Sequence, residues 1–372
     1  MKVEELTKII DSDFYAGVPD SQLKALCNYL MDRYGIDPLH HVIAANEGNC
    51  VALAAGYHLA TGKTAVVYMQ NSGEGNAINP LASLTNEKVY NIPAVLIIGW
   101  RGEPGVHDEP QHVYQGEITL KLLEVMGISY HVITEDSLVE EVESVMNDFR
   151  EQLKNGKTVA FVVKKGALSY SGKVDYNNSE ILKREEIIEE ILKHSGECPI
   201  VSTTGKASRE LFELREKRGE GHNLDFLTVG SMGHSSSIAL AIAAQKPGKK
   251  IICIDGDGAM LMHMGAMAVN GSLGINNLIH IVINNSAHET VGGMPTVAGK
   301  IDLTKIASGC GYKNIASISK LNELGEEIEK ALNCSEMSFI EVKCGIGARA
   351  DLGRPTTTPQ ENKIAFMNEL SR

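Results

Sequence analysis

The sequence predicts an α/β protein made of two doubly wound domains, each built around a parallel sheet. Short apolar runs alternate with helix-length amphipathic stretches along the whole chain, which is the pattern of layered α/β folds. Two runs, IICID at 251–255 and LIHIVIN at 278–284, are almost wholly apolar, as expected for strands that helices cover on both faces. The 372 residues are enough for two hydrophobic cores.

In the first half of the chain, six short apolar runs are expected to be strands. They lie at 14–16, 41–43, 64–69, 94–98, 129–133 and 159–163. Helices are expected at 21–34, where Ser21 is a suitable N-cap, and at 47–61, which is rich in alanine and ends at Gly62. These elements define a first domain over residues 1–165.

A polar, glycine-containing stretch without periodicity, KKGALSYSGKVDYNN at 164–178, follows the last of these strands. Such a composition favours a linker, which we assign to residues 166–180. In the second half, strands are expected at 200–202, 226–227, 251–255, 278–284 and 338–342. They define a second domain over residues 181–372 with the same layering.

Charge and cysteine content narrow the class of protein. The chain has 35 basic and 47 acidic residues and a net charge of −12, so nucleic acid and anionic membranes are not expected as partners. The seven cysteines are scattered and form no CxxC pair, which favours reduced thiols in a cytoplasmic protein over a disulfide framework or a zinc site. Neither a signal-peptide pattern nor an apolar run of about 18 residues occurs, so we expect no membrane span.

The motif with the most chemical content is Gly-Asp-Gly at 256–258, directly after an apolar strand. The next strand ends in Asn284 and Asn285, and Asn285 lies 28 positions after Asp257 (285 − 257 = 28). A helix over 259–270 and a glycine-rich loop would fill this interval. In a right-handed β-α-β unit the carboxyl ends of both strands share one edge of the sheet. Asp257 and Asn285 would there offer oxygen ligands to Mg²⁺ and a phosphorylated ligand.

Two other interpretations of this motif are weaker. Gly-Asp-Gly and Asn-Asn also occur in ordinary turns, but the pair at this spacing after two strands favours a functional site. A dinucleotide-binding fingerprint would need glycine at position 261, where the chain has Leu261.

The pair resembles the thiamine-diphosphate motif of the enzymes that use this cofactor. The resemblance implies Mg²⁺ bound by Asp257, Asn285 and the backbone carbonyl of Ala287. It also implies a diphosphate-binding second domain, in which the segment 229–237 (VGSMGHSSS) supports the bent cofactor through Met232. The alternative for Met232 is ordinary core packing. The other residues of this domain expected at the cofactor are Thr204, Gly205, Ser231, Gly256, Gly258 and Ala259.

The same resemblance assigns the first domain to the cofactor's aminopyrimidine. The segment 44–63 (AANEGNCVALAAGYHLATGK) matches the family's pattern and places Glu47 at the start of a helix. Glu47 is expected to hydrogen-bond N1′, and burial would raise the pKa of Glu47 so that it can share that proton. A glutamate at a helix N-terminus is also common for structural reasons. Asn71, Ser72 and Gly73 belong to a loop that resembles the family's pyrimidine-binding loop.

The chain leaves no room for a middle domain, which narrows the resemblance to the two-domain phosphonopyruvate and sulfopyruvate decarboxylases. Three stretches favour the phosphonopyruvate enzymes, namely GVPDS at 17–21, GWRGEPGVHDEPQHVYQG at 99–116 and NNSAHETVGGMPT at 284–296. The reaction that this resemblance implies is the non-oxidative decarboxylation of 3-phosphonopyruvate. A carboligase similar to acetolactate synthase is disfavoured by the missing middle domain. A non-catalytic cofactor-binding module is disfavoured because such a module has no need of Glu47.

The remaining expectations concern the substrate and the assembly. A phosphonate requires cations within an acidic protein, and the candidates are Arg101, Lys206, Arg209, Arg349 and Arg354. The candidates for supplying a proton after carbon dioxide leaves are His107, His112, Asp20 and Ser21. Relatives place the cofactor between the first domain of one subunit and the second domain of another, so the resemblance implies at least a homodimer.

Overall fold

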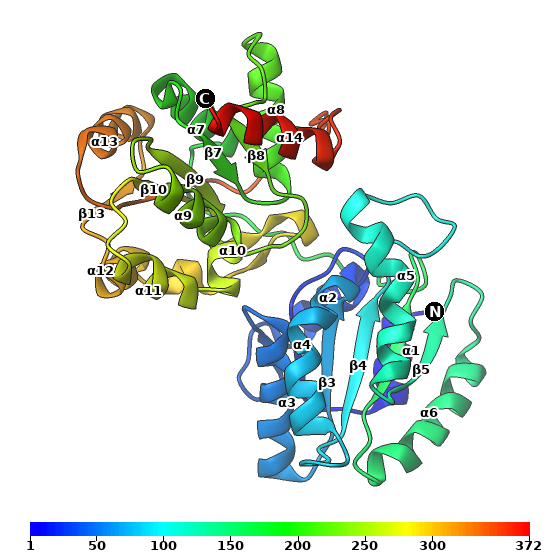
Figure 1. Cartoon of the computed structure of the whole chain (residues 1–372). Helices are drawn as coiled ribbons and strands as arrows, with labels where there is room; N and C mark the ends of the chain where they lie inside the picture. The colour runs from blue at the N-terminus through cyan, green and yellow to red at the C-terminus, as the bar shows by residue number, and fades with distance from the viewer. The chain divides into compact units, whose positions relative to one another are not determined.

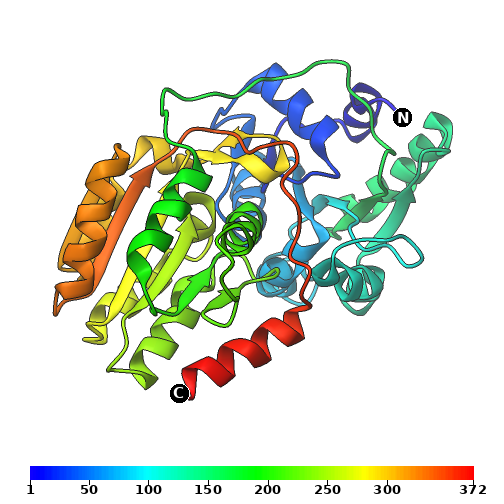
Figure 2. The same ribbon diagram turned by 90° about the horizontal axis from the view of Figure 1, so that it is seen from above.

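The computed structural model describes all residues 1–372 and divides the chain into two compact units, Met1–Asp175 and Tyr176–Arg372 (Figure 1). The division falls inside the segment 166–180 that we expect to be the linker. Residues 164–183 contain no helix and no strand of either sheet, and Figure 2 shows this green stretch as extended chain. No helix combines the length and the apolar character needed to cross a membrane.

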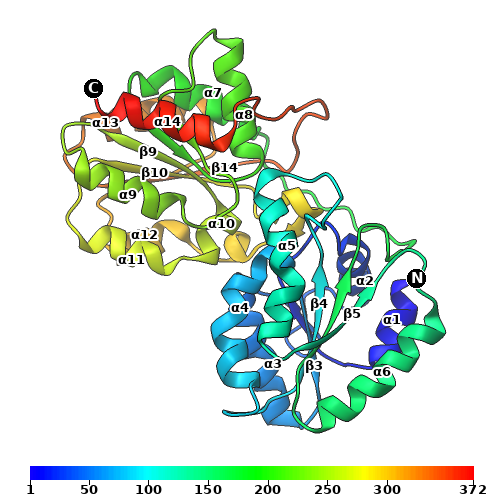
Figure 3. The same ribbon diagram turned by 45° about the vertical axis from the view of Figure 1, so that its right-hand side comes forward.

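The first unit is a six-stranded parallel sheet with helices on both faces. Its strand order is β2-β1-β3-β4-β6-β5, and the bounds are β1 Tyr15–Gly17, β2 His41–Ile43, β3 Ala65–Gln70, β4 Ala94–Gly99, β5 Ser129–Ile133 and β6 Val159–Val163. One face carries α1 (Val3–Ile10), α2 (Lys24–Tyr34) and α6 (Val139–Lys154). The other carries α3 (Glu47–Thr61), α4 (Glu74–Pro80) and α5 (Pro110–Val125), as Figure 3 shows. Two short helical turns, η1 (Asn71–Gly73) and η2 (Leu81–Thr85), flank α4.

The second unit is also a six-stranded parallel sheet, in the order β13-β14-β10-β9-β7-β8. Its strands are β7 Ile200–Ser202, β8 Asp225–Leu227, β9 Ile251–Gly256, β10 Leu278–Asn284, β13 Asn314–Ile318 and β14 Ser338–Lys343. One face carries α7 (Arg184–Ser195), α8 (Lys206–Lys217) and α13 (Leu321–Asn333). The other carries α9 (Ser235–Gln245), α10 (Asp257–Met262), α11 (Gly265–Ser272) and α12 (Leu303–Cys310).

Smaller elements complete the second unit at the ends of its sheet. A two-stranded ribbon of β11 (Ala287–His288) and β12 (Met294–Pro295) follows β10, with the helical turns η3 (Glu289–Val291) and η4 (Val297–Lys300) beside it. The C-terminal helix α14 (Pro359–Leu370) contacts β8 and is the red helix of Figure 2.

The two sheets have the same topology. In each, the first strand lies between the second and the third, and the fourth, sixth and fifth strands follow in that order. β9 and β10 therefore correspond to β3 and β4. Because all strands of one sheet are parallel, their carboxyl ends lie at one edge, which is where ligands of open α/β sheets bind.

The predicted fold class is confirmed, and every predicted strand has a counterpart in the structure. Two predicted helices have wrong bounds. The helix expected at 21–34 begins at Lys24, because residues 21–23 form a turn. The helix expected at 259–270 is two helices, α10 and α11, because the backbone leaves helical geometry at His263. Strand β13 was not predicted, since its residues NIASI are mostly half-exposed and form no continuous apolar run.

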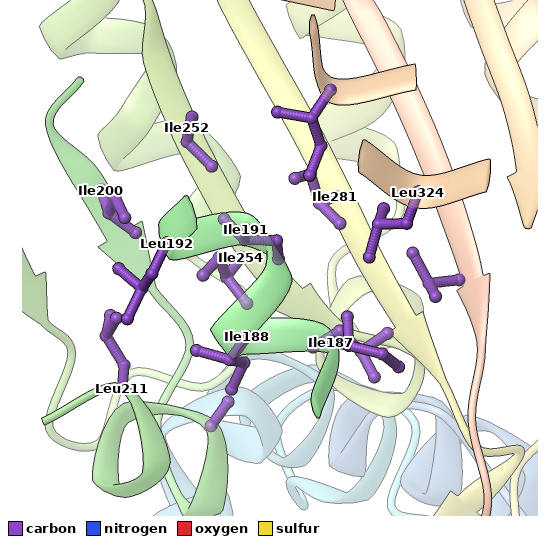
Figure 4. Packing of buried hydrophobic residues seen from close by; sticks show 14 of the residues in the cluster. Ile187, Ile188, Ile191, Leu192, Ile200, Leu211, Ile252, Ile254, Ile281 and Leu324 are labelled. Atoms are coloured by element: carbon purple, nitrogen blue, oxygen red, sulfur yellow. The ribbon is translucent and has the colours of Figure 1, made fainter. Parts of the chain in front are cut away.

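Packing in the core of the second unit shows which strand residues face each of the two helix layers. Ile252 and Ile254 of β9 and Ile281 of β10 pack with apolar residues of α7, α8 and α13 (Figure 4). Successive side chains of a strand point to opposite faces of the sheet. Cys253 and Asp255 of β9 therefore point to the other layer, which contains α9 to α12.

Replacing Ile281 with alanine is expected to lower the free energy of unfolding of the second unit by about 2–5 kcal/mol, because a fully buried side chain leaves a cavity. Urea denaturation followed by circular dichroism measures this change. The matched control is Ile364→Ala on α14, where the side chain is 54% exposed and the expected change is below about 0.5 kcal/mol. Equal effects of the two substitutions would contradict this placement of Ile281.

Candidate functional site

Asp257 and Asn285 lie at the carboxyl ends of the neighbouring strands β9 and β10. Both are buried, and the backbone N–H of Asn285 is among the groups that stabilise the Asp257 carboxylate. Thr296 donates a hydrogen bond from Oγ1 to Asp257 Oδ2 at 2.5 Å. Burial raises the pKa of Asp257 to about 6, and these hydrogen bonds offset only part of that effect. The structure thus brings together the two side chains that the sequence motif pairs.

The side chain of Asn285 is oriented by groups that the sequence analysis did not identify. Its Nδ2 donates to Glu289 Oε2 at 2.8 Å, and its Oδ1 accepts from the backbone N–H of Ala287 at 3.1 Å. Asn178, in the segment between the two sheets, donates from Nδ2 to the backbone carbonyl of Asn285 at 2.9 Å. The side-chain amide and the backbone carbonyl of Asn285 are therefore both held in place by hydrogen bonds.

Glu289 belongs to a buried network of charged side chains. Its carboxylate accepts hydrogen bonds from Lys206 Nζ at 2.6 Å and from Arg184 Nη1 at 2.9 Å. Arg184 also binds Glu210 through Nε at 2.7 Å. Two cations and two carboxylates therefore compensate one another next to Asn285. These partners lie on α7, α8 and η3, so no local sequence pattern could reveal them.

His288 is a second residue that the sequence analysis missed. It precedes Glu289 and is buried against the first turn of α10, where a Cβ on Gly258 would lie 3.5 Å from His288 Nδ1. Burial lowers the pKa of His288 to about 4, so its imidazole is neutral at physiological pH. Ala259 follows Gly258 and is also buried.

Several hydroxyl groups at the same edge of the second sheet are buried without hydrogen-bond partners. They belong to Thr203 after β7, Thr228 after β8 and Ser235 at the start of α9. Buried polar groups are normally hydrogen-bonded. Unpartnered hydroxyls at a ligand-binding edge are therefore suited to bind a polar ligand. Together with the buried Asp257 carboxylate, they are a suitable donor set for a diphosphate and its cation.

The glycine-rich loops expected at the cofactor lie next to these hydroxyls. Thr204 Oγ1 accepts from the backbone N–H of Gly230 at 3.1 Å and so joins the loops after β7 and β8. Gly205, with φ +94°, starts α8, and Ser231 has φ +47°. Met232 is half-buried.

In the first unit, Glu47 is the first residue of α3 and is only 5% exposed. Asn46 caps the helix by accepting from the backbone N–H of Gly48 at 2.8 Å. Asn76 of α4 donates to Glu47 Oε2 at 2.7 Å. A Cβ on Gly73 would lie 2.4 Å from Glu47 Oε1, so the carboxyl needs glycine there. Burial raises the pKa of Glu47.

Asn71 and Ser72 are used to hold the loop after β3 in place. Asn71 Nδ2 donates to the backbone carbonyl of Arg101 at 2.8 Å and to Thr119 Oγ1 at 2.9 Å. Ser72 Oγ donates to Gln70 Oε1 at 2.8 Å. These contacts tie η1 to α5 and to the segment after β4.

Asp20, Ser21 and Arg101 come together at the carboxyl edge of the first sheet. Asp20 is fully buried, accepts from Gln70 Nε2 at 2.7 Å and has no partner for Oδ2. Burial raises the pKa of Asp20. Arg101 donates from Nη1 to Ser21 Oγ at 3.2 Å and from Nε to Asp108 at 2.7 Å.

The two candidate histidines differ in environment, and only His107 lies in the loop after β4, because His112 is in the first turn of α5. His107 is exposed, and no hydrogen bond joins it to the residues around Asp20. His112 is half-buried and its Nδ1 has no partner. Burial, with a smaller contribution from Arg101, lowers the pKa of His112 to about 4. His112 is therefore neutral at physiological pH and holds no additional proton that it could donate.

The basic residues proposed for the substrate already have partners within the chain. Arg209 donates from Nε to the backbone carbonyl of Gly353 at 2.5 Å. Arg349 forms ion pairs with Glu185, Glu213 and Asp351. Arg354 is exposed. Among the proposed basic residues of the second unit, only Lys206 is hydrogen-bonded to a residue that contacts Asn285, namely Glu289.

Glu74, directly after Gly73, is a buried acid that the sequence analysis did not single out. It is 5% exposed and neither carboxyl oxygen has a hydrogen-bond partner, although Thr119 and Gln115 lie nearby. Burial raises the pKa of Glu74 to about 8.

Comparison with known proteins also assigns a different binding domain to each half of the chain. Residues 4–123 match the family model described as the thiamine pyrophosphate enzyme, N-terminal TPP binding domain, and residues 203–342 match the C-terminal TPP binding domain. Phosphonopyruvate decarboxylase of Streptomyces viridochromogenes is 31% identical, with 93% of this chain and 88% of the relative covered. That of Streptomyces hygroscopicus is also 31% identical, with 93% and 87% covered. Sulfopyruvate decarboxylase of Methanosarcina acetivorans is 28% identical, with 92% and 90% covered.

Glu74→Gln is expected to raise the free energy of unfolding by several kcal/mol at pH 9 and to change it little below pH 4.5. The pKa of Glu74 is 4.5 when unperturbed and about 8 in the folded protein. Stability from the neutral acid is therefore complete below pH 4.5 and is lost as the pH rises through 8. A difference of one in pKa corresponds to about 1.4 kcal/mol.

Urea denaturation at the two pH values measures the effect, and Glu140→Gln, on the exposed side of α6, is the matched control. The same change at both pH values would show that Glu74 is not a buried neutral acid.

Proposed function

The chain belongs to the thiamine pyrophosphate enzymes and is a thiamine-diphosphate-dependent decarboxylase, and from that premise we propose that it converts 3-phosphonopyruvate to phosphonoacetaldehyde and carbon dioxide. The observation that carries this substrate is the match to phosphonopyruvate decarboxylases, 31% identical over 93% of the chain. The match to a sulfopyruvate decarboxylase, 28% identical over 92% of the chain, makes sulfopyruvate the second candidate.

The proposed cation is Mg²⁺, held by the Asp257 carboxylate, the Asn285 side chain and the backbone carbonyl of Ala287. The support for this assignment is the buried state of Asp257, whose ionised form a hard cation would stabilise. Glu289 occupies the amide N–H₂ group of Asn285, so a cation would bind Oδ1 through the lone pair that the backbone N–H of Ala287 does not use. The unpartnered hydroxyls of Thr203 and Ser235 support diphosphate binding at the same edge.

Glu47 is the proposed acid that acts on the aminopyrimidine. Thiamine diphosphate, when bound, would supply a nucleophilic carbon for the ketone and a cationic ring able to take up the electron pair of the bond to carbon dioxide. The role of Glu47 is to hold a proton at N1′. Its raised pKa, caused by burial, favours the protonated carboxyl, and the hydrogen bond from Asn76 fixes its orientation.

Asp20 is the group we favour for delivering the proton to the product carbon. Its carboxyl is fully buried, has one oxygen without a partner and has a raised pKa, so it can retain a proton. Arg101 and Ser21 lie beside it and would orient the substrate. His112 is neutral and His107 is exposed, which makes them weaker candidates.

Lys206 is the proposed partner of the phosphonate. It shares the Glu289 carboxylate with Arg184, and with a side chain 26% exposed against 9% for Arg184 it is the more accessible of these two cations. An ammonium group binds phosphonate oxygens as a compact point charge. Arg209, Arg349 and Arg354 would act on the substrate only after giving up or sharing their present contacts.

We further propose a cytoplasmic enzyme that is at least a homodimer, with the cofactor between the first domain of one subunit and the second domain of another. The support for an assembly is that the candidate cofactor residues are divided between the two units, with Glu47 in the first and Asp257 in the second. The seven cysteines are all free, which supports a reducing compartment.

Glu47→Gln is expected to lower kcat by at least about 100-fold, because the amide cannot share the N1′ proton. Thiamine diphosphate should still bind, which quenching of Trp100 fluorescence and calorimetry can test. The control is Glu117→Gln on the exposed side of α5, which should keep full activity. Near-normal turnover of Glu47→Gln would remove Glu47 from the mechanism.

The substrate assignment is tested by carbon dioxide release from phosphonopyruvate, sulfopyruvate and pyruvate with thiamine diphosphate and Mg²⁺. We expect the highest kcat/KM for phosphonopyruvate. Lys206→Met should lower kcat/KM for phosphonopyruvate more than for pyruvate, which lacks the second acidic group. A higher kcat/KM for sulfopyruvate would replace the proposed substrate and keep the cofactor chemistry.

A further inference from the structure

Three side chains with metal-binding chemistry meet inside the second unit, outside the site described above. They are Cys253 and Asp255 of β9 and His280 of β10, and each is at most 1% exposed. Cys253 and His280 are directly paired across the two strands. All three point to the layer of α9 to α12, opposite the isoleucine cluster of Figure 4. Their ligand atoms, a thiol sulfur, a carboxylate oxygen and an imidazole nitrogen, lie within 4.8 Å of one another.

The distance between the carboxylate and the imidazole is long for a charge-assisted hydrogen bond. Asp255 Oδ2 and His280 Nε2 are 3.4 Å apart. A charge-assisted hydrogen bond is shorter, about 2.7–2.9 Å. Two ligands of one tetrahedral zinc ion, each bonded at about 2.0–2.2 Å, are about 3.3–3.6 Å apart. The observed separation fits two ligands of a shared cation.

The negative charge of Asp255 also favours a cation at this position. Two other buried carboxylates of this unit are paired with arginine, since Asp225 accepts two hydrogen bonds of 2.9 Å from Arg215 and Glu210 is bound by Arg184. Asp255 has no arginine partner: its Oδ1 accepts from the backbone N–H of Gly256 at 2.9 Å, and His280 is its one ion-pair partner. A buried carboxylate without good compensation is costly, and a divalent cation would compensate both Asp255 and a Cys253 thiolate.

Hydrogen-bonding groups hold the His280 imidazole in an orientation that suits a metal ligand. His280 Nδ1 lies 3.3 Å from the hydroxyl of Tyr312, and that hydroxyl also accepts from Asn270 Nδ2 at 3.2 Å. If Nδ1 carries the proton toward Tyr312, Nε2 is left as the ligand atom. Metal-binding histidines usually have such a partner on the other ring nitrogen.

We propose that Cys253, Asp255 and His280 form a site for a thiophilic divalent transition metal, with Zn²⁺ as its representative. A thiolate, a carboxylate and an imidazole together favour such a metal over Mg²⁺, and a water molecule would complete a tetrahedron. The ion would join β9 to β10, the strands that end at Asp257 and Asn285. The inference does not depend on the proposed substrate or reaction.

The test uses the full chain produced in minimal medium with added Zn²⁺ or Co²⁺, because buried ligands must be loaded while the protein folds. After dialysis against chelator and then excess Mg²⁺, elemental analysis should find about one zinc per chain, as a closed site retains its ion. The cobalt protein should show a thiolate-to-cobalt charge-transfer band. Wild-type protein without retained zinc and without this band would overturn the proposal.

Variants identify the ligands. Cys253→Ser should abolish the charge-transfer band, and His280→Gln should reduce the retained zinc to background. The matched control Cys198→Ser, at a half-buried cysteine outside the cluster, should keep both signals. Zinc content unaffected by Cys253→Ser and His280→Gln would place the metal elsewhere and refute the site. If a variant does not fold, the cobalt spectrum of the wild-type protein still decides whether a thiolate is a ligand.

Discussion

Burial of carboxyl groups at the carboxyl ends of two parallel sheets is the constraint on which the rest of this structure depends. Removing a carboxylate from water costs several kcal/mol unless donors or cations compensate it. Glu47 and Asp20 meet this constraint as acids whose pKa burial has raised. Asp257 relies on Thr296 and on backbone N–H groups. Glu289 relies on Arg184 and Lys206. The chemistry of a thiamine-diphosphate enzyme needs both kinds of group, a protonated acid and an ionised ligand.

The repeated topology explains how one architecture supplies both kinds of carboxyl group. Each sheet has the strand order 2-1-3-4-6-5, so the loops after the third and fourth strands meet at one edge in either unit. In the first unit these loops contain Asn71, Gly73 and Arg101, which fix the surroundings of Glu47 and Asp20. In the second unit the equivalent positions carry Asp257 and Asn285. The same backbone framework therefore holds buried acids with a raised pKa in one case and the proposed metal ligands in the other.

The sequence was sufficient for the fold class, for nearly all strands and for the convergence of Asp257 and Asn285. These features follow from local patterns, namely apolar runs and the fixed geometry of a β-α-β unit. The partners of the site residues could not be predicted. Asn76 is 29 positions from Glu47, and Arg184 is 105 positions from Glu289, so only the packed structure pairs them. Strand β13 escaped prediction because its side chains are mostly half-exposed. The break between α10 and α11 depends on the backbone at His263 and on no strong sequence signal.

The contact of Asn178 with Asn285 has a thermodynamic consequence. Asn178 lies in the chain that connects the two sheets and donates to the backbone carbonyls of Asn285 and Cys344. Any ligand that restricts Asn285 therefore also restricts the connecting segment. Coupling of this kind is reciprocal, so ordering the segment strengthens ligand binding by the same factor. The order of the chain at Asn178 and the binding of a ligand at Asn285 are in this sense two expressions of one free energy.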